Sequence, residues 1–112
     1  MNPITNTVLT NIRKQWLVES AESDLGLWWL AEDLREYLGD DASEEEVLAA
    51  TLEALRPLLE SGNLRAVMLL EGGNFEAWDG DIPQQLSRVA EGWRAVGKPT
   101  IGDVVWFIGD RS

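Results

Sequence analysis

The spacing of apolar residues predicts a first helix over residues 25–38. Leucine and alanine recur there at i, i+3, i+4 and i+7, which is the period of one buried helical face. Asp24 is the expected N-cap of this helix, and Gly39 is its expected stop. The preceding residues 4–19 fit two structures, because their apolar positions have helical spacing while the segment around Trp16 also fits a short strand.

A second helix is expected between Ser43 and Gly62. Ser43 and Glu46 match the S-x-x-E capping box, and acidic residues in the first turn favour the positive end of the helix dipole. Leucine and valine define one buried face along this segment. Pro57 lies inside the pattern and is expected to kink or break the helix, because proline lacks the amide hydrogen that the helix needs.

After Gly62 the apolar period changes from that of a helix to that of strands. Residues 63–70 predict a strand, residues 72–74 a turn, and residues 75–78 the returning strand of a hairpin. The middle of the chain is therefore expected to form a β-hairpin.

A third helix and a final strand complete the expected order. Pro83 suits the first turn of a helix that Gly97 ends, and the apolar run 104–108 predicts a strand paired with the hairpin. Two helices followed by a hairpin are the outline of a winged-helix domain. The pattern thus predicts one α+β domain over residues 1–112, winged-helix-like, with helices packed on a small antiparallel sheet formed by the hairpin and the C-terminal strand.

Composition supports a single folded domain. The chain has 112 residues, 45% of them hydrophobic, and six tryptophans, which are enough to bury a core. It has no run of about 18 apolar residues and no secretory signal pattern, so we expect a cytoplasmic protein with no membrane contact. It has no cysteine, which excludes disulfides and zinc–thiolate sites.

The net charge of −11 is concentrated in the first half of the chain. Residues 1–61 carry 13 acidic and 4 basic side chains, whereas residues 62–112 carry 7 and 5. Such a field repels phosphate backbones and attracts basic partners, although solubility is a sufficient reason for it. Glu46, Glu53 and Glu60 form an acidic stripe on the second predicted helix, which argues against binding of DNA or RNA.

The side-chain chemistry argues against an enzyme. Without histidine or cysteine, a Ser–His–Asp triad and a Cys–His pair are excluded. The carboxylate pairs Asp40–Asp41 and Asp79–Asp81 lie in predicted turns, where aspartate bonds its own backbone. The acidic segment 40–46 lacks the alternating ligands and central glycine of a calcium loop, so no metal or cofactor is expected.

Trp29 is the aromatic residue with the clearest functional interpretation. On a helical wheel it falls opposite the leucine face, beside the acidic side chains of its own helix. An aromatic ring surrounded by carboxylates is typical of a hot spot for a basic partner, but Ile12 or Trp16 of the N-terminal segment would also be placed to cover it. The residues expected to bind a partner are Trp29, Glu32, Asp33, Glu36, Glu46, Glu53 and Glu60.

The second half of the chain carries a family resemblance. It contains Leu58-Leu59-Glu60-Ser61-Gly62, Gly73-Asn74-Phe75 with Trp78, Trp93-Arg94-Ala95-Val96-Gly97, Pro99-Thr100-Ile101-Gly102-Asp103 and Val105-Trp106-Phe107. These segments resemble a family of short, acidic, uncharacterised bacterial proteins that end in a G-D-x-x-W-F-like motif. The matching residues are turn and core positions, so the resemblance implies a fold and no site residues. By size and charge, such proteins look like immunity proteins or antitoxins that block basic toxins.

Three functions follow from these observations, in a definite order of preference. The first is a non-catalytic protein-binding module, of the immunity or antitoxin type, that inhibits a basic partner through its acidic surface. The second is a structural or regulatory domain that associates with itself, for which the acidity serves solubility alone. The third is an enzyme that uses paired carboxylates. The sequence leaves the oligomeric state open.

Overall fold

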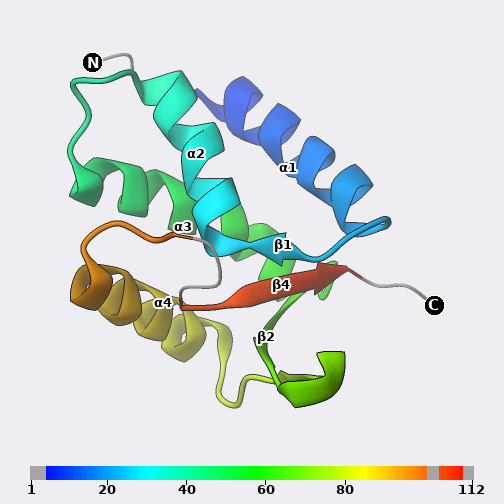
Figure 1. Ribbon diagram of the computed structural model, residues 1–112. Coiled ribbons are helices and arrows are strands. Elements are labelled where there is room, and N and C mark those ends of the chain that lie inside the picture. Colours follow the sequence, from blue (N-terminus) through cyan, green and yellow to red (C-terminus); the bar gives the residue numbers. More distant parts are fainter. Residues whose placement is uncertain (1–4, 101–103, 110–112) are drawn as a thin grey trace.

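The computed structural model describes residues 5–100 and 104–109. The elements follow one another as α1 (Asn6–Ser20), β1 (Leu25–Gly26), α2 (Leu27–Leu38), α3 (Glu44–Glu60), β2 (Leu64–Leu69), a 3-10 turn η1 (Glu71–Gly73), β3 (Phe75–Ala77), α4 (Ile82–Val96) and β4 (Trp106–Gly109). The helices gather around the short strands, and α3 packs against α1, α2 and α4 (Figure 1).

The sheet has the strand order β1-β4-β2-β3, and every neighbouring pair is antiparallel. The α+β fold with a hairpin and a paired C-terminal strand is therefore confirmed. Strand β4 lies between β1 and β2, so that Phe107 stands opposite Leu25 on one side and Ala66 on the other. The first strand is thus held by the last.

The ambiguous N-terminal segment is helical. Thr5 caps α1 by accepting a hydrogen bond at its Oγ1 from the amide of Val8, at 3.2 Å. Leu9, Ile12 and Trp16 of this helix are buried, which is the one-sided pattern that their spacing indicated. The alternative strand around Trp16 does not form.

The expected start of the next helix was wrong by two residues. Leu25 and Gly26 pair with β4, and α2 begins at Leu27 with Gly26 at the N-cap position in place of Asp24. A Cβ atom on Gly26 would lie 1.6 Å from the ring of Trp28, so only glycine fits this junction. Pairing with a distant strand outweighs the local cap, whereas the predicted stop at Gly39 is confirmed, with φ of 90°.

Helix α3 has the predicted capping box of Ser43 and Glu46, but it continues through Pro57 to Glu60. The carbonyl of Glu53 would normally accept the amide hydrogen that Pro57 lacks. Arg13 of α1 supplies a donor instead: its Nη2 donates to the Glu53 carbonyl and its Nε to the Ala54 carbonyl, both at 2.9 Å. The expected break is absent, and α1 satisfies the Glu53 carbonyl that the proline leaves open.

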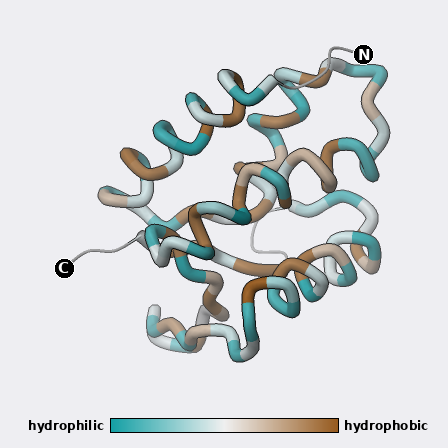
Figure 2. The backbone as a smooth tube through the Cα atoms, turned by 180° about the vertical axis from the view of Figure 1, so that it is seen from behind, coloured by the Kyte–Doolittle hydropathy of each residue, from teal (hydrophilic) through white to brown (hydrophobic). Residues whose placement is uncertain are grey.

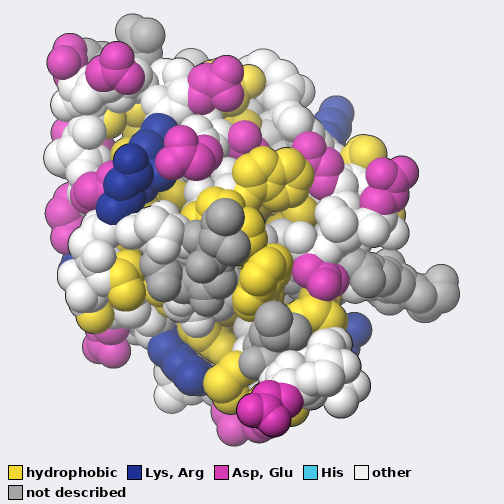
Figure 3. Space-filling view, in the orientation of Figure 1, with side chains coloured by type: hydrophobic (Ala, Val, Ile, Leu, Met, Phe, Trp, Pro, Cys, Tyr) yellow, Lys and Arg dark blue, Asp and Glu magenta, His cyan; other side chains and the backbone are white. Residues whose placement is uncertain are grey.

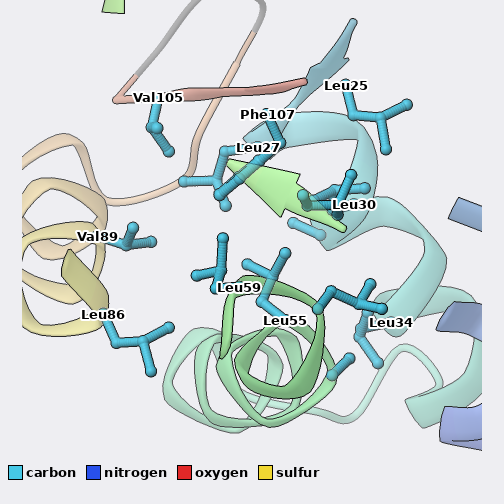
Figure 4. Packing of buried hydrophobic residues seen from close by; sticks show 14 of the residues in the cluster. Leu25, Leu27, Leu30, Leu34, Leu55, Leu59, Leu86, Val89, Val105 and Phe107 are labelled. Carbon is cyan, nitrogen blue, oxygen red and sulfur yellow. The ribbon is translucent and has the colours of Figure 1, made fainter. Parts of the chain in front are cut away.

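The core lies between the helices and one face of the sheet. Figure 2 shows hydrophobic and hydrophilic residues alternating along every helix, as amphipathic packing requires. In Figure 4 the buried side chains that converge are Leu27, Leu30 and Leu34 of α2, Leu55 and Leu59 of α3, Leu86 and Val89 of α4, and Phe107 of β4. Full burial of each such side chain contributes about 1.5–3 kcal/mol.

Trp28, in the first turn of α2, packs on Trp106 of β4. The rings of Trp28 and Trp106 meet edge to face, with centroids 5.0 Å apart and planes at 83°. Trp106 stands opposite Gly26 in the ladder, so the missing side chain of that glycine makes room for the pair. This contact holds the start of α2 against β4. The next residue of the helix is Trp29.

Candidate protein-binding face on α2

The outer side of α2 borders a surface hollow of about 570 Å³. Its lining comprises Trp29, Glu32, Asp33, Arg35, Glu36, Asp40 and Lys98. Four of these are residues that the sequence pointed to, and they come together because they share the side of α2 that faces away from the core. Figure 3 shows acidic side chains across the part of the surface where α2 lies, with hydrophobic side chains between them.

Trp29 is exposed over 36% of its surface. The N-terminal helix therefore does not bury it completely. Trp16 is instead fully buried, and its indole Nε1 donates a hydrogen bond to the Asp33 Oδ2 at 2.8 Å. The aromatic residue of α1 thus anchors one carboxylate of α2 and leaves Trp29 open to solvent.

The carboxylates of this hollow are neutralised to different degrees. Arg35 forms an ion pair with Glu32 and a two-point ion pair with Glu44 of α3. Within residues 5–100 and 104–109, the structure shows no ion pair for Glu36 or Asp40. Among the described residues, these two carboxylates of the hollow are therefore not neutralised by an ion pair.

Glu44 connects three helices behind this hollow. It is the first residue of α3, its Oε2 accepts a hydrogen bond from the Nε1 of Trp93 in α4 at 2.9 Å, and both its oxygens accept from Arg35 of α2. Burial opposes ionisation of Glu44, but the hydrogen bonds from Arg35 and Trp93 and the nearby charges of Arg35 and Lys98 outweigh it. The pKa of Glu44 consequently lies below its ordinary value.

The remaining predicted residues form what we call the α3 stripe (Glu46, Glu53 and Glu60). Glu46 is half-buried, and its Oε1 accepts from the amide and hydroxyl of Ser43 in the capping box. Glu53 and Glu60 are exposed on α3. None of the three lines the α2 hollow, so the structure does not bring the two acidic groups into one site.

The alternative chemical sites have structural roles or no convergent partners. Asp81 caps α4, because its Oδ1 accepts from the amide of Gln84 at 2.9 Å. Over the described part of the chain, no group of three or more acidic side chains is placed to hold a metal ion. Over the same residues, no helix is long and apolar enough to cross a membrane.

Sequence reasoning missed Asp40, Lys98, Arg35 and Glu44 as neighbours of the acidic helix face. Asp40 follows α2 in a loop, and its turn propensity concealed its place in the hollow. Lys98 comes from the segment after α4, and no spacing along the chain indicates that it returns to α2. Arg35 is three residues after Glu32 on α2, a local spacing that could have indicated it, whereas Glu44 and Lys98 approach α2 only in the folded chain.

Comparison with protein-family models, curated proteins and solved structures gives no match for this chain. Of the G-D-x-x-W-F motif, Gly102 and Asp103 lie outside the described residues, while Trp106 and Phe107 belong to β4. The functional assignment therefore depends on the chemistry of the α2 hollow itself.

Proposed function

We propose that this chain is a non-catalytic protein-binding module whose ligand is a basic surface of another protein. The binding surface is the α2 face, defined as Trp29, Glu32, Asp33, Glu36 and Asp40. The observation that carries the proposal is the exposed ring of Trp29 at a hollow where Glu36 and Asp40 have no ion pair within the described part of the chain.

The two kinds of side chain on the α2 face have different roles in this proposal. The carboxylates attract a basic partner over distances of about a Debye length, roughly 8–10 Å at moderate salt, and orient it before contact. Trp29 then supplies apolar area at short range and stacks on a lysine or arginine side chain of the partner. Charge thus sets the association rate, and the aromatic ring slows dissociation.

In its narrower form, the proposal is an inhibitor of the immunity or antitoxin type. The supporting features are the small size, the net charge of −11 and the placement of carboxylates around an apolar anchor. In such an inhibitor, the carboxylates of the α2 face take the place of substrate phosphate groups in the basic active site of the partner.

Site-specific photo-cross-linking in the cell that makes this chain tests the proposal. We would replace Trp29 by a benzophenone amino acid, whose aromatic side chain keeps an apolar ring at the anchor position, and place the same amino acid at position 60, which is exposed on α3, as the matched control. We expect a protein with a basic surface to be captured at position 29 and not at position 60. Capture should be lost when Glu36 and Asp40 are both changed to lysine.

Two kinds of result, one from cross-linking and one from sedimentation, would contradict the proposal. The first is capture of the same proteins at both positions, or capture at position 29 that survives the charge reversal. The second is sedimentation of the purified chain as a stable dimer in which Trp29 is buried, because that result favours the self-associating domain.

A further inference from the structure

We propose that Glu44 is a positioning residue for the α2 face: it holds the Arg35 cation in place and so keeps Glu36 and Asp40 free for a basic partner. This inference rests on the proposed function, since it describes how the charge of the same surface is controlled. It assigns a role to a carboxylate that does not itself line the hollow.

The geometry of Arg35 shows how the cation is held. Its Nε lies 3.1 Å from the Glu44 Oε1, and its Nη2 lies 2.9 Å from each Glu44 oxygen, while its Nη1 bonds Glu32. The planar guanidinium group thus presents one edge to Glu44 in the two-point arrangement that fixes its orientation. Only 16% of the Arg35 side chain is exposed, although the residue lines the hollow.

Glu44 can hold Arg35 because it is itself anchored from two sides. The indole of Trp93, which is 1% exposed, donates to the Glu44 Oε2, and the N-terminus of α3 favours a negative charge at its first residue. An anchored carboxylate on α3 therefore holds the Nε–Nη2 edge of the Arg35 guanidinium group toward α3.

Without this hold, Arg35 keeps only the bond to Glu32 on its own helix. Its long, flexible side chain is then free to turn toward Glu36 and Asp40, which line the same hollow. An arginine in that position neutralises the carboxylates internally and competes with the partner's cations. Glu44 thus determines whether the acidic surface is available, although it contacts no partner.

Glu45 provides a matched control for Glu44. It is the next residue of α3 and carries the same charge, but its oxygens accept from Arg94, at 2.8 and 3.1 Å. Glu45→Gln therefore changes the net charge as Glu44→Gln does and leaves Arg35 held. An excess effect of Glu44→Gln therefore does not come from total charge, and the Arg35→Gln background separates a contribution of Arg35 from one of the bond to Trp93.

The first measurement follows the side-chain Nε–H signal of Arg35 by NMR in the full chain. We expect slow hydrogen exchange in the wild type and in Glu45→Gln, and faster exchange in Glu44→Gln. Unchanged exchange in Glu44→Gln would overturn the inference. This measurement needs no ligand, and circular dichroism on the same samples establishes that the variants are folded.

The second measurement uses a fluorescent nona-arginine peptide at low salt. We expect Glu44→Gln to weaken its affinity about fivefold more than Glu45→Gln does, which is the scale of a misplaced interface charge. The excess should vanish in the Arg35→Gln background, because the cation that Glu44 holds by hydrogen bonds is then absent, while Lys98, the other cation of the hollow, is the same in every variant. Equal weakening by the two variants, or an excess that persists without Arg35, would overturn this inference and leave the proposed function in place.

The same peptide separates this inference from the proposed function. If the wild type does not bind it, or if lysine at positions 36 and 40 has no more effect than lysine at positions 53 and 60, the proposed function fails, and the inference fails with it. Binding confined to the α2 face, with equal effects of Glu44→Gln and Glu45→Gln, leaves the proposed function in place.

Discussion

On the α2 face, carboxylates from a helix and the loop after it line one hollow together with an exposed tryptophan. On the α3 stripe, three carboxylates follow one helix, and the first of them, Glu46, is engaged in the capping box of that helix. Both groups are acidic, and the sequence suggested that they act together. Of these two regions, the α2 face combines carboxylates with an exposed aromatic ring at one hollow, and the α3 stripe does not, which is why the proposed function assigns binding to the α2 face.

The largest expected difference between the two regions concerns Trp29. Trp29→Ala should weaken binding of the basic partner captured at position 29 by about 2 kcal/mol, roughly 30-fold, because truncation removes the apolar anchor. Tyr37→Ala is the control, since Tyr37 is 48% exposed on the same helix but does not line the hollow. Isothermal titration calorimetry measures both. Similar losses for the two variants would remove the distinction between an anchor and any exposed aromatic residue.

A second prediction concerns the backbone of α3, where Arg13 compensates for Pro57. Arg13→Met should lower the free energy of unfolding by about 1–2 kcal/mol, because the Glu53 carbonyl loses its donor. In a Pro57→Ala background the loss should be smaller by about 1 kcal/mol, since residue 57 then has an amide hydrogen. Lys14→Met controls for the charge. Urea denaturation measures the cycle, and strictly additive effects would show that Arg13 does not replace the missing donor.

A third prediction separates the two acidic regions by stability and binding. Glu46→Ala should cost about 0.5 kcal/mol of stability through the capping box and leave nona-arginine binding unchanged. Glu36→Ala should show the reverse, with weaker binding and a change in stability within about 0.5 kcal/mol. Thermal unfolding and peptide titration on both variants make the comparison. A binding loss in Glu46→Ala equal to that in Glu36→Ala would join the α3 stripe to the binding surface.

The smallest expected effect is a pH dependence at Glu44. Its pKa is lowered in the folded protein, so its ionised form contributes stability above the ordinary glutamate pKa, and this contribution is lost as the pH falls through the folded pKa. The stability difference between the wild type and Glu44→Gln should therefore be largest near neutral pH and should shrink in acid. Urea denaturation at a series of pH values measures it. A stability difference that stays constant in acid would mean that the interaction with Arg35 does not stabilise the ionised form of Glu44.

Local signals accounted for most of the helices. The capping box at Ser43, the stop at Gly39 and the one-sided leucine patterns act within a few residues, so the sequence alone revealed them. Strand β1 could not be predicted, because Leu25 and Gly26 pair with residues at the far end of the chain. The continuous helix through Pro57 depends likewise on Arg13, which arrives from another helix.

The candidate site was predictable on one helix only. The helical wheel correctly placed Trp29 away from the core, beside Glu32, Asp33 and Glu36. The contributions of Lys98 and Glu44 depend on how α3 and α4 pack against α2, and no periodic pattern encodes that arrangement. Charge along a helix shows which side is acidic, but tertiary contacts decide which carboxylates stay unpaired.

The association rate of nona-arginine tests most directly whether the α2 face is a local binding surface. Stopped-flow fluorescence at low salt compares two double variants, one with lysine at positions 36 and 40 (the α2 variant) and one with lysine at positions 53 and 60 (the α3 variant). Each reversal adds two positive charges, so the net charge of both double variants changes from −11 to −7. We predict that the α2 variant associates at least about tenfold more slowly than the wild type, whereas the α3 variant stays within about threefold. Equal slowing in both variants would show that total charge alone attracts the peptide and would contradict a binding surface on α2.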